Sequence, residues 1–250
     1  MPPSVVLIRH AEALHNAAKE HMLTHPDDDQ AVTGEHFLDP GLSDLGRKQA
    51  AELGEHLKGG LLANRKVGLI VVSPMRRTLE TCLIALGWLM DQGVRVEPDA
   101  RWQELWDKPC DTGVPAAQLA AEFPQFDFSR LDPVYPDKTS PAGAAYRYSR
   151  SAVLARGRAA LQDVRDRSGC ADGELVLVVT HSGFLRRSVA GRWFANADYR
   201  VFDFAPPVVD EEEDESARVQ LVEWDLTREH GGLGRSSAEV VEWGDGLPER

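Results

Sequence analysis

The sequence predicts an α/β protein of three layers, α/β/α, with a mostly parallel central sheet. Three apolar runs, Val5–Ile8, Val67–Val72 and Leu175–Val179, lack the alternation of a half-exposed strand. Such runs suit strands that helices bury on both faces. Segments of helix-forming composition lie between these runs and after them, which is typical of parallel strands joined by crossover helices.

The remaining elements follow from local patterns in chain order. Helical spacing of apolar residues predicts helices over 46–58, 75–90 and 146–167, the last interrupted only by Gly157. Strands are expected at 67–74 and 175–179, with a short strand at 94–97 and edge strands near 199–204 and 219–226.

We expect one domain over residues 1–227. Residues 105–146 are rich in Pro, Asp and aromatics and contain one short helical pattern near 116–122. A long irregular insert of this kind is usually a cover or a binding loop. Residues 228–250 contain five glycines and are expected to form a loosely ordered tail.

Composition excludes several classes of partner. The net charge of -12 argues against a nucleic-acid partner, because polyanion binding requires clustered Lys and Arg. No stretch reaches the roughly 18–20 apolar residues of a membrane span, and the N-terminus lacks a signal-peptide pattern. Three widely spaced cysteines without a CxxC pair favour a reducing, cytoplasmic compartment. The acidic run Asp210–Glu215 is interpreted as a solvated loop, with a binding tail as the alternative.

Polar residues that can bind an anion or act as a nucleophile follow each of the three apolar runs. Arg9 and His10 follow the first, Ser73 and the pair Arg76–Arg77 follow the second, and His181 follows the third. The carboxyl ends of such strands share one edge of the sheet, so these residues should converge. Guanidinium groups match phosphate oxygens, and a neutral imidazole is a nucleophile. The pattern therefore predicts an anion site with a nucleophile.

Several separated motifs, in order, resemble those of the histidine phosphatase superfamily, in its phosphoglycerate-mutase-like branch. They are "RHAEALHN", "DPGLSDLGRKQA", "SPMRRTLET" and "VTHSGFLR", and "ELWDKPCDTG", "FPQFDFS" and "FANADYRVF" further resemble fungal and plant proteins of this branch. The resemblance covers Ser4 to about Phe204. It implies a phosphoglycerate-mutase-like fold.

The resemblance also implies a role for each matching residue. His10 would attack phosphorus and become a phosphohistidine, while Arg9, Arg77 and His181 hold the phosphoryl oxygens. Asn16 would add a donor to the same pocket. Glu104 matches the acid that protonates the leaving oxygen, with Asp111 in the same loop as the replacement candidate. The two-step route needs no metal and no cofactor.

The chain departs from the family pattern at three places. Ala11 replaces the usual Gly, which still permits close approach of a phosphate. An extra segment lies between Asn16 and Asp39. The site residues that family members take from this loop are therefore not assigned in this sequence. Helical periodicity does not choose between Arg76 and Arg77, and only the motif favours Arg77. Arg76 would then pair with Glu80, four residues on.

Two further groups of residues have a structural and a functional interpretation. His15, His21, His25 and His36, with Asp27–Asp29, fit no standard metal-ligand spacing and are interpreted as a mobile surface loop, in preference to a metal site. Trp102, Trp106, Phe123, Phe126 and Phe128 either pack loops onto the core, which is commoner, or wall an apolar substrate pocket.

The sequence thus predicts a metal-independent phosphatase that hydrolyses a small organic phosphate monoester through a phosphohistidine. The first alternative is phosphoglycerate-mutase-type phosphoryl transfer, which would need a closed, basic pocket; the insert carries few basic residues, Lys108, Arg130 and Lys138. The second is a non-catalytic module that binds a phospho-ligand, which the intact set of His10, Arg77, Glu104 and His181 opposes. The physiological substrate does not follow from the sequence.

Overall fold

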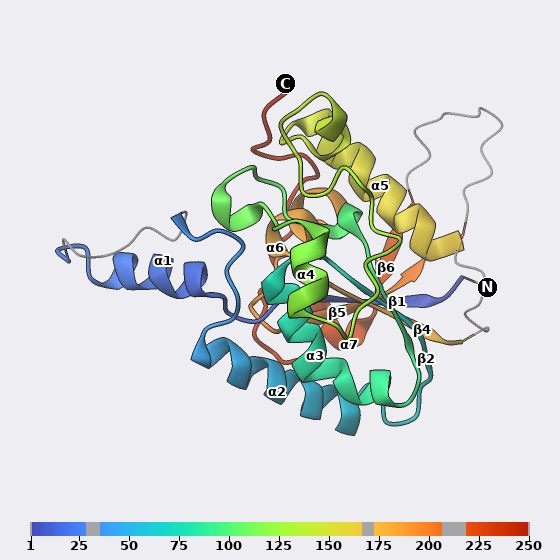
Figure 1. Cartoon of the computed structure of the whole chain (residues 1–250). Helices are drawn as coiled ribbons and strands as arrows, with labels where there is room; N and C mark the ends of the chain where they lie inside the picture. Colours follow the sequence, from blue (N-terminus) through green and yellow to red (C-terminus); the bar gives the residue numbers. More distant parts are fainter. Residues whose placement is uncertain (1, 29–35, 167–172, 207–218, 250) are drawn as a thin grey trace.

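A computed structural model describes residues 2–28, 36–166, 173–206 and 219–249. The strands are β1 (Ser4–Arg9), β2 (Val67–Val72), β3 (Arg95–Pro98), β4 (Leu175–Thr180), β5 (Tyr199–Phe204) and β6 (Leu221–Glu223). The helices are α1 (Leu14–Thr24), α2 (Asp44–Gly59), α3 (Arg76–Asp91), α4 (Ala116–Glu122), α5 (Arg150–Asp166), α6 (Ser182–Phe184) and α7 (Asp225–Arg228) (Figure 1). Within these residues, no helix combines the length and apolarity needed to cross a bilayer.

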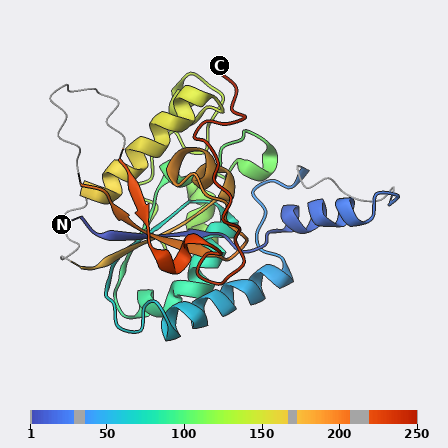
Figure 2. The ribbon, with the colours of Figure 1, turned by 180° about the vertical axis from the view of Figure 1, so that it is seen from behind.

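The central sheet has six strands in the order β3-β2-β4-β1-β5-β6. The first four strands in this order are parallel to one another. At one side of the sheet, β5 pairs antiparallel with β1, and β6 pairs antiparallel with β5 (Figure 2). Arg9 pairs with Thr180, and Val72 pairs with Val179. The carboxyl ends of β1, β2 and β4 therefore lie side by side, as the sequence predicted.

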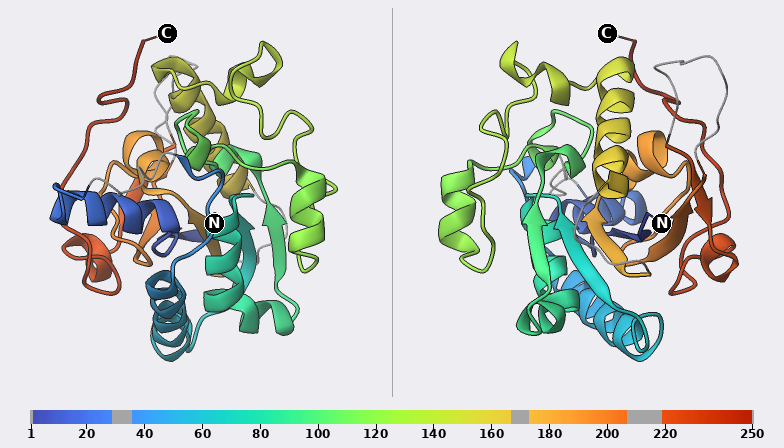
Figure 3. Two further views of the ribbon diagram at one scale, coloured as in Figure 1. Left: turned by 60° about the vertical axis from the view of Figure 1, so that its left-hand side comes forward. Right: turned by 90° about the vertical axis from the view of Figure 1, so that its right-hand side faces the viewer.

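Helices cover both faces of the sheet and account for the uninterrupted apolar runs. In β1, Val6 and Ile8 pack with α2 and α3, whereas Val5 and Leu7 pack with α5 and the turn after β4. The two helical layers are visible above and below the strands (Figure 3). Alternate residues of one strand thus enter two different cores, and both must be apolar.

Helix α5 begins at Arg150, four residues later than predicted, because residues 142–146 form a separate 3-10 turn. The insert is packed on the domain as well. Phe123, Phe126 and Phe128 are buried in the core on the α2–α3 side, and Trp102 is buried on the other. These aromatics pack the insert, and only Trp106 is half-exposed.

The segment after the first strand is partly helical, and the expectation of a mobile loop is wrong for α1. Its sequence, LHNAAKEHMLT, contains good helix formers, yet none of its residues is fully buried. Helix α1 projects from the body of the molecule in Figures 1 and 2. His21 pairs with Asp28 at 2.8 Å, and residues 29–35, including Asp29, lie outside the described residues.

The C-terminal segment differs from the loosely ordered tail that its glycines suggested. The buried Asp198 carboxylate accepts hydrogen bonds from the backbone N–H groups of Leu233 (2.8 Å) and Ser236 (2.9 Å). Gly231, at φ 72°, lies where a Cβ would meet the Asp198 carboxylate. Leu247 is buried in the core. The glycine here allows close approach to a buried charge, and the segment is ordered by that charge. The acidic run 210–215 lies outside the described residues.

Gly157 brings α5 against the turn that follows His181. A Cβ at this position would lie 2.4 Å from the backbone oxygen of Ser188 and 2.8 Å from its Cβ. The backbone of α5 packs directly against the backbone of the turn at Ser188. Only glycine leaves room for this contact, although glycine weakens a helix. Gly87 in α3 has no atom within 4 Å of the same built position.

We therefore expect Gly157→Ala and Gly87→Ala to change stability in opposite directions. The first should lower the free energy of unfolding by about 1–3 kcal/mol through overpacking. The second should raise it by up to about 1 kcal/mol through helix propensity. Urea unfolding followed by circular dichroism measures both. Equal effects of the two substitutions would contradict the packing assigned to Gly157.

Candidate active site

Residues from three strand ends meet at one edge of the sheet. His10 follows β1 and His181 follows β4, and their ring centroids lie 5.2 Å apart at an interplanar angle of 61°. Arg77, in the first turn of α3 after β2, contacts His10. All three side chains are buried. The predicted convergence of His10, Arg77 and His181 is therefore present.

The hydrogen bonds of His10 define its tautomer. The Arg77 Nε–H group donates to His10 Nε2 at 3.2 Å, so this nitrogen carries no proton. The proton is on Nδ1, which donates to the backbone oxygen of Ala11 at 2.6 Å. Burial and the charges of Arg77 and Arg9 hold the pKa of His10 well below its usual value. His10 is thus a neutral imidazole with a lone pair on Nε2.

Arg77 is held by the insert. Its Nη1 donates to the backbone oxygen of Cys110 at 2.6 Å, and its Nη2 donates to Asp111 Oδ1 at 2.9 Å. The Arg77 side chain is 1% exposed and that of Asp111 is 9% exposed. The ion pair therefore exists away from water, where its geometry is well fixed. In the structure Asp111 is the partner of Arg77.

Arg76 contacts α4 and not His10, so Arg77 is the one of the two arginines that enters the site. Arg76 forms two hydrogen bonds of 2.7 Å with the Glu122 carboxylate of α4. The predicted pairing of Arg76 with Glu80 is wrong, because Glu80 pairs with Arg47 of α2 at 2.9 Å. Contacts between elements have overridden the spacing within one helix.

Arg9 and His181 each bring an unpaired buried nitrogen to the site. Arg9 Nη1 donates to the backbone oxygen of Phe194 at 2.8 Å, while its Nε has no partner among the described residues. His181 Nε2 lies 2.8 Å from Ser73 Oγ, and His181 Nδ1 likewise has no partner within the described ranges. In the tautomer in which the Ser73 hydroxyl donates to Nε2, the proton of His181 is on Nδ1. Both nitrogens can then donate to the oxygens of an anion.

Asn16 lies at the start of α1 and contacts this cluster only in part. Its Oδ1 accepts a hydrogen bond from the backbone N–H of Ala13 at 3.1 Å, which fixes the orientation of the amide. Its Nδ2 donates to His15 Nε2 at 3.0 Å. One N–H of this amide is therefore used by His15, and the second can still serve the predicted donor role.

His15 is a site residue that the sequence analysis missed. Its ring centroid lies 6.2 Å from that of His10. Because Asn16 donates to Nε2, the proton of His15 is on Nδ1, which is buried and has no partner in the described part of the chain. Burial, followed by the charges of Arg77 and Arg9, lowers the pKa of His15. The available signal was its place beside Asn16 in "RHAEALHN".

Glu104 is bound by three backbone N–H groups. Its Oε1 accepts from Leu105 and Phe184, each at 2.9 Å, and its Oε2 accepts from Gly183 at 3.1 Å. A Cβ at Gly183 would lie 2.6 Å from Oε1, so only glycine allows this approach. Burial, followed by the Asp111 charge, raises the pKa of Glu104. A raised pKa favours the protonated carboxyl, which is the form that a general acid needs.

Lys138 orders the loop that carries Glu104 and Asp111, a role that the sequence did not reveal. Its buried Nζ donates to the backbone oxygens of Glu104 (2.9 Å), Trp106 (2.8 Å) and Asp111 (2.5 Å). All three of its hydrogens therefore have acceptors in one loop. This residue ties the insert to the site, although it lies 34 residues from Glu104 in the chain.

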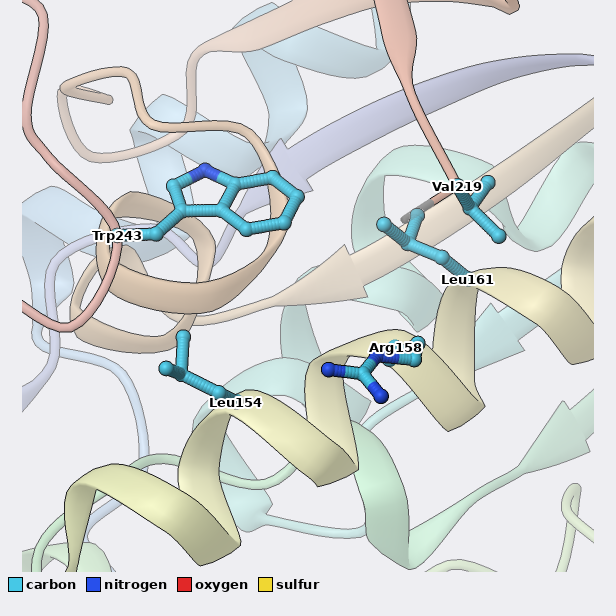
Figure 4. A pocket seen from close by; sticks show the side chains of 5 residues that line it. All are labelled: Leu154, Arg158, Leu161, Val219 and Trp243. Carbon is cyan, nitrogen blue, oxygen red and sulfur yellow. The ribbon is translucent and has the colours of Figure 1, made fainter. Parts of the chain in front are cut away.

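A separate hollow lies between α5 and the C-terminal segment. Figure 4 shows Leu154, Arg158 and Leu161 of α5 facing Val219 and Trp243. Its volume is about 20 Å³, which suits a water molecule and nothing larger. The functional residues lie elsewhere. Among the residues that the structure describes, no group of three or more His, Cys, Asp or Glu side chains is arranged to hold a metal ion.

Comparison with known proteins gives relatives over most of the chain. A "probable phosphatase" of Schizosaccharomyces pombe is 34% identical over 157 residues, which are 61% of this chain and 66%, just under two thirds, of that protein. A "phosphoglycerate mutase-like protein" of Arabidopsis thaliana is 26% identical over 276 aligned positions, covering 98% of this chain and 92% of its own length.

The fold is also that of a solved structure, an ecdysone phosphate phosphatase of Bombyx mori in complex with tungstate. The two share 18% identity and a TM-score of 0.53, over 87% of this chain and 98% of the other. At this identity the similarity speaks for the fold alone. The model of the histidine phosphatase superfamily (branch 1) matches residues 5–207, which carry the whole cluster around His10. With that match over most of its length, the chain belongs to the histidine phosphatase superfamily.

Proposed function

We propose that the protein is a metal-independent phosphatase that hydrolyses a small organic phosphate monoester through a phosphohistidine on His10. The observation that carries the proposal is the hydrogen bond that Arg77 Nε–H donates to His10 Nε2 at 3.2 Å. An unprotonated Nε2 lies beside the Arg77 guanidinium, and unpaired nitrogens of Arg9 and His181 lie in the same buried cluster. A nucleophile within a set of fixed cationic and neutral donors suits phosphoryl transfer.

Two successive displacements follow from this arrangement. His10 Nε2 forms a bond to phosphorus as the bond to the leaving oxygen breaks, and the protonated Glu104 gives its proton to that oxygen. Water then attacks phosphorus, Glu104 takes one of its protons, and the N–P bond breaks to restore neutral His10 and release phosphate. Arg9, Arg77 and His181 balance the charge on the phosphoryl oxygens in both steps.

The described contacts favour hydrolysis over mutase-type transfer, the first alternative. A mutase must hold an intermediate against water in a closed, basic pocket. Lys138, one of the few basic residues of the insert, spends its three N–H groups on backbone oxygens. A purely binding module, the second alternative, has no need for a neutral nucleophile and a proton donor with a raised pKa.

His10→Ala is expected to lower phosphate release by more than about 1,000-fold, because no other described group replaces the nucleophile. His21→Ala, an exposed histidine of α1 paired with Asp28, is the matched control. The assay uses p-nitrophenyl phosphate in excess chelator, with an alkaline detergent quench to trap the phosphoenzyme, which is stable in alkali and labile in acid. Activity of His10→Ala within tenfold of the parent, or loss of parent activity in chelator that zinc or magnesium restores, would contradict the mechanism.

Glu104→Gln is expected to slow phosphorylation of the enzyme far more with an alkyl phosphate than with p-nitrophenyl phosphate. An alkoxide needs a proton on departure, whereas a nitrophenolate hardly does, and general acid catalysis contributes about 10²- to 10⁴-fold. The alkyl ester should also react more slowly as pH rises through the raised pKa of Glu104. Single-turnover kinetics isolates this step.

The nitrophenyl ester is an internal control for the fold of the Glu104→Gln variant. Arg77→Ala should slow both esters, because the charge it balances is on the transferred group in either case. Equal losses with the two leaving groups in Glu104→Gln would remove Glu104 as the acid. Asp111 would then be the next candidate.

His15 offers a test of the donor set around the phosphoryl group. The amide nitrogen of an Asn side chain overlays Nδ1 of His, whereas that of Gln overlays Nε2. His15→Asn should therefore retain the vanadate inhibition constant within about threefold, and His15→Gln should raise it by about 10- to 100-fold, the worth of one hydrogen bond to a charged group. Steady-state inhibition measures both. Equal constants for the two variants would show that the Nδ1–H group does not contact the anion.

A further inference from the structure

The peptide bond between Ala11 and Glu12 connects His10 to helix α2. Its carbonyl oxygen accepts the Nδ1–H group of His10 at 2.6 Å. Its N–H group donates to Gln49 Oε1, on α2, at 2.9 Å. Because a backbone N–H group can only donate, the oxygen of the Gln49 amide must face it. One peptide plane therefore joins the Gln49 side chain to the ring of His10.

The first turn of α2 is fixed against the same loop. The Ser43 N–H group donates to the backbone oxygen of Glu12 at 3.0 Å, and the Ser43 hydroxyl caps α2 by accepting from the Gly46 N–H group at 3.0 Å. A Cβ at Gly46 would collide with the backbone oxygen of Glu12. Both backbone groups of Glu12 are thus bound by α2, which holds Gln49 in place beside the peptide.

The preceding peptide bond, between His10 and Ala11, is held by α3. The Ala11 N–H group donates to Thr81 Oγ1 at 3.1 Å, and the Thr81 hydroxyl donates to the backbone oxygen of Arg77 at 2.7 Å. Since Ala11 is fully buried, its backbone groups depend on partners within the protein. Two helices therefore fix the two peptide bonds that follow the nucleophile.

The hydrogen bonds of the Ala11–Glu12 peptide act in series. An acceptor on the N–H side of a peptide moves electron density to its carbonyl oxygen, so the second hydrogen bond becomes stronger. Gln49 thereby makes the Ala11 oxygen a better acceptor for His10 Nδ1–H. That bond holds the proton on Nδ1 and fixes the plane of the ring. A carboxylate orients the histidine in a catalytic triad, and here a polarised peptide has that place.

We propose that Gln49 is a positioning residue for the reaction, which acts on His10 through the Ala11–Glu12 peptide. It fixes the orientation of the ring and helps to keep the proton on Nδ1. Gln49 lies in the segment "DPGLSDLGRKQA", which supplies none of the groups of the proposed mechanism. The effect on rate rests on the proposed function, whereas the effect on the Nδ1–H group does not.

The kinetic test removes the acceptor and then restores it. Gln49→Met has a similar length and no acceptor, and it should slow phosphorylation of the enzyme by p-nitrophenyl phosphate by about 10- to 100-fold. The inhibition constant of inorganic phosphate should stay within about threefold, because the groups that hold the phosphoryl oxygens are intact. Gln49→Glu supplies an acceptor again and should stay within about threefold of the parent rate. Single-turnover kinetics measures the step.

Gln162→Met is the matched control, because Gln162 is an exposed residue of α5 whose amide donates to Asp166 and not to the site. It should leave the rate unchanged. Gln49→Ala, which also lacks an acceptor and favours a helix, repeats the test if the methionine variant does not fold. Phosphorylation at the parent rate without the acceptor, or an equal loss in Gln49→Glu, would overturn the proposal.

Proton NMR of histidine-labelled protein separates this inference from the proposed function. The Nδ1–H resonance of His10, identified by its loss in His10→Ala, should move upfield and exchange faster with water in Gln49→Met, and it should persist in Gln49→Glu. An unchanged resonance in Gln49→Met overturns the inference even if the rate falls. Absence of a phosphoenzyme in the parent overturns the proposed function and leaves this resonance to decide on Gln49.

Discussion

The contact between Arg77 and His10 is the interaction on which the site depends. A guanidinium can only donate, so its Nε–H group at 3.2 Å from His10 Nε2 keeps that nitrogen unprotonated. The same side chain reaches the Cys110 backbone oxygen and the Asp111 carboxylate. One buried arginine therefore sets the tautomer of the histidine and attaches the insert to the sheet edge. Since Arg77 is fully buried, its partners must stay in place, because an unpaired charge there would be costly.

Backbone groups, more than opposite charges, hold Glu104 and Lys138. Glu104 is bound by three N–H groups, and Lys138 by three carbonyl oxygens. Burial, followed by the Asp111 charge, raises the pKa of Glu104, whereas the N–H groups of Leu105 and Gly183 favour the charged carboxylate and act in the opposite direction. The hydrogen bonds therefore order the insert, while burial and the Asp111 charge give the Glu104 carboxyl its capacity to hold a proton.

Sequence pattern predicted the strands correctly where both faces of the strand are buried. It failed where contacts from distant parts of the chain replace those between near neighbours. The apolar runs of β1, β2 and β4 are buried on both faces, so they were recognisable. The pairing of Arg76 with Glu80 was wrong because Glu122 and Arg47, from other helices, bind these side chains at 2.7 and 2.9 Å. The glycine-rich C-terminal segment was misjudged because the buried Asp198 carboxylate, distant in the chain, orders it.

The sequence by itself determined the α/β class, the strand ends that carry Arg9, His10, Arg77 and His181, and the family motifs, because these depend on periodicity and on residue type within short segments. Only the tertiary structure decided which nitrogen of His10 is unprotonated, that His15 enters the site and that Lys138 holds the loop of Glu104. The tautomer of His10 and the contacts of Lys138 depend on hydrogen-bond partners many residues apart, and the place of His15 depends on the burial of its ring beside His10. No pattern along the chain encodes either quantity.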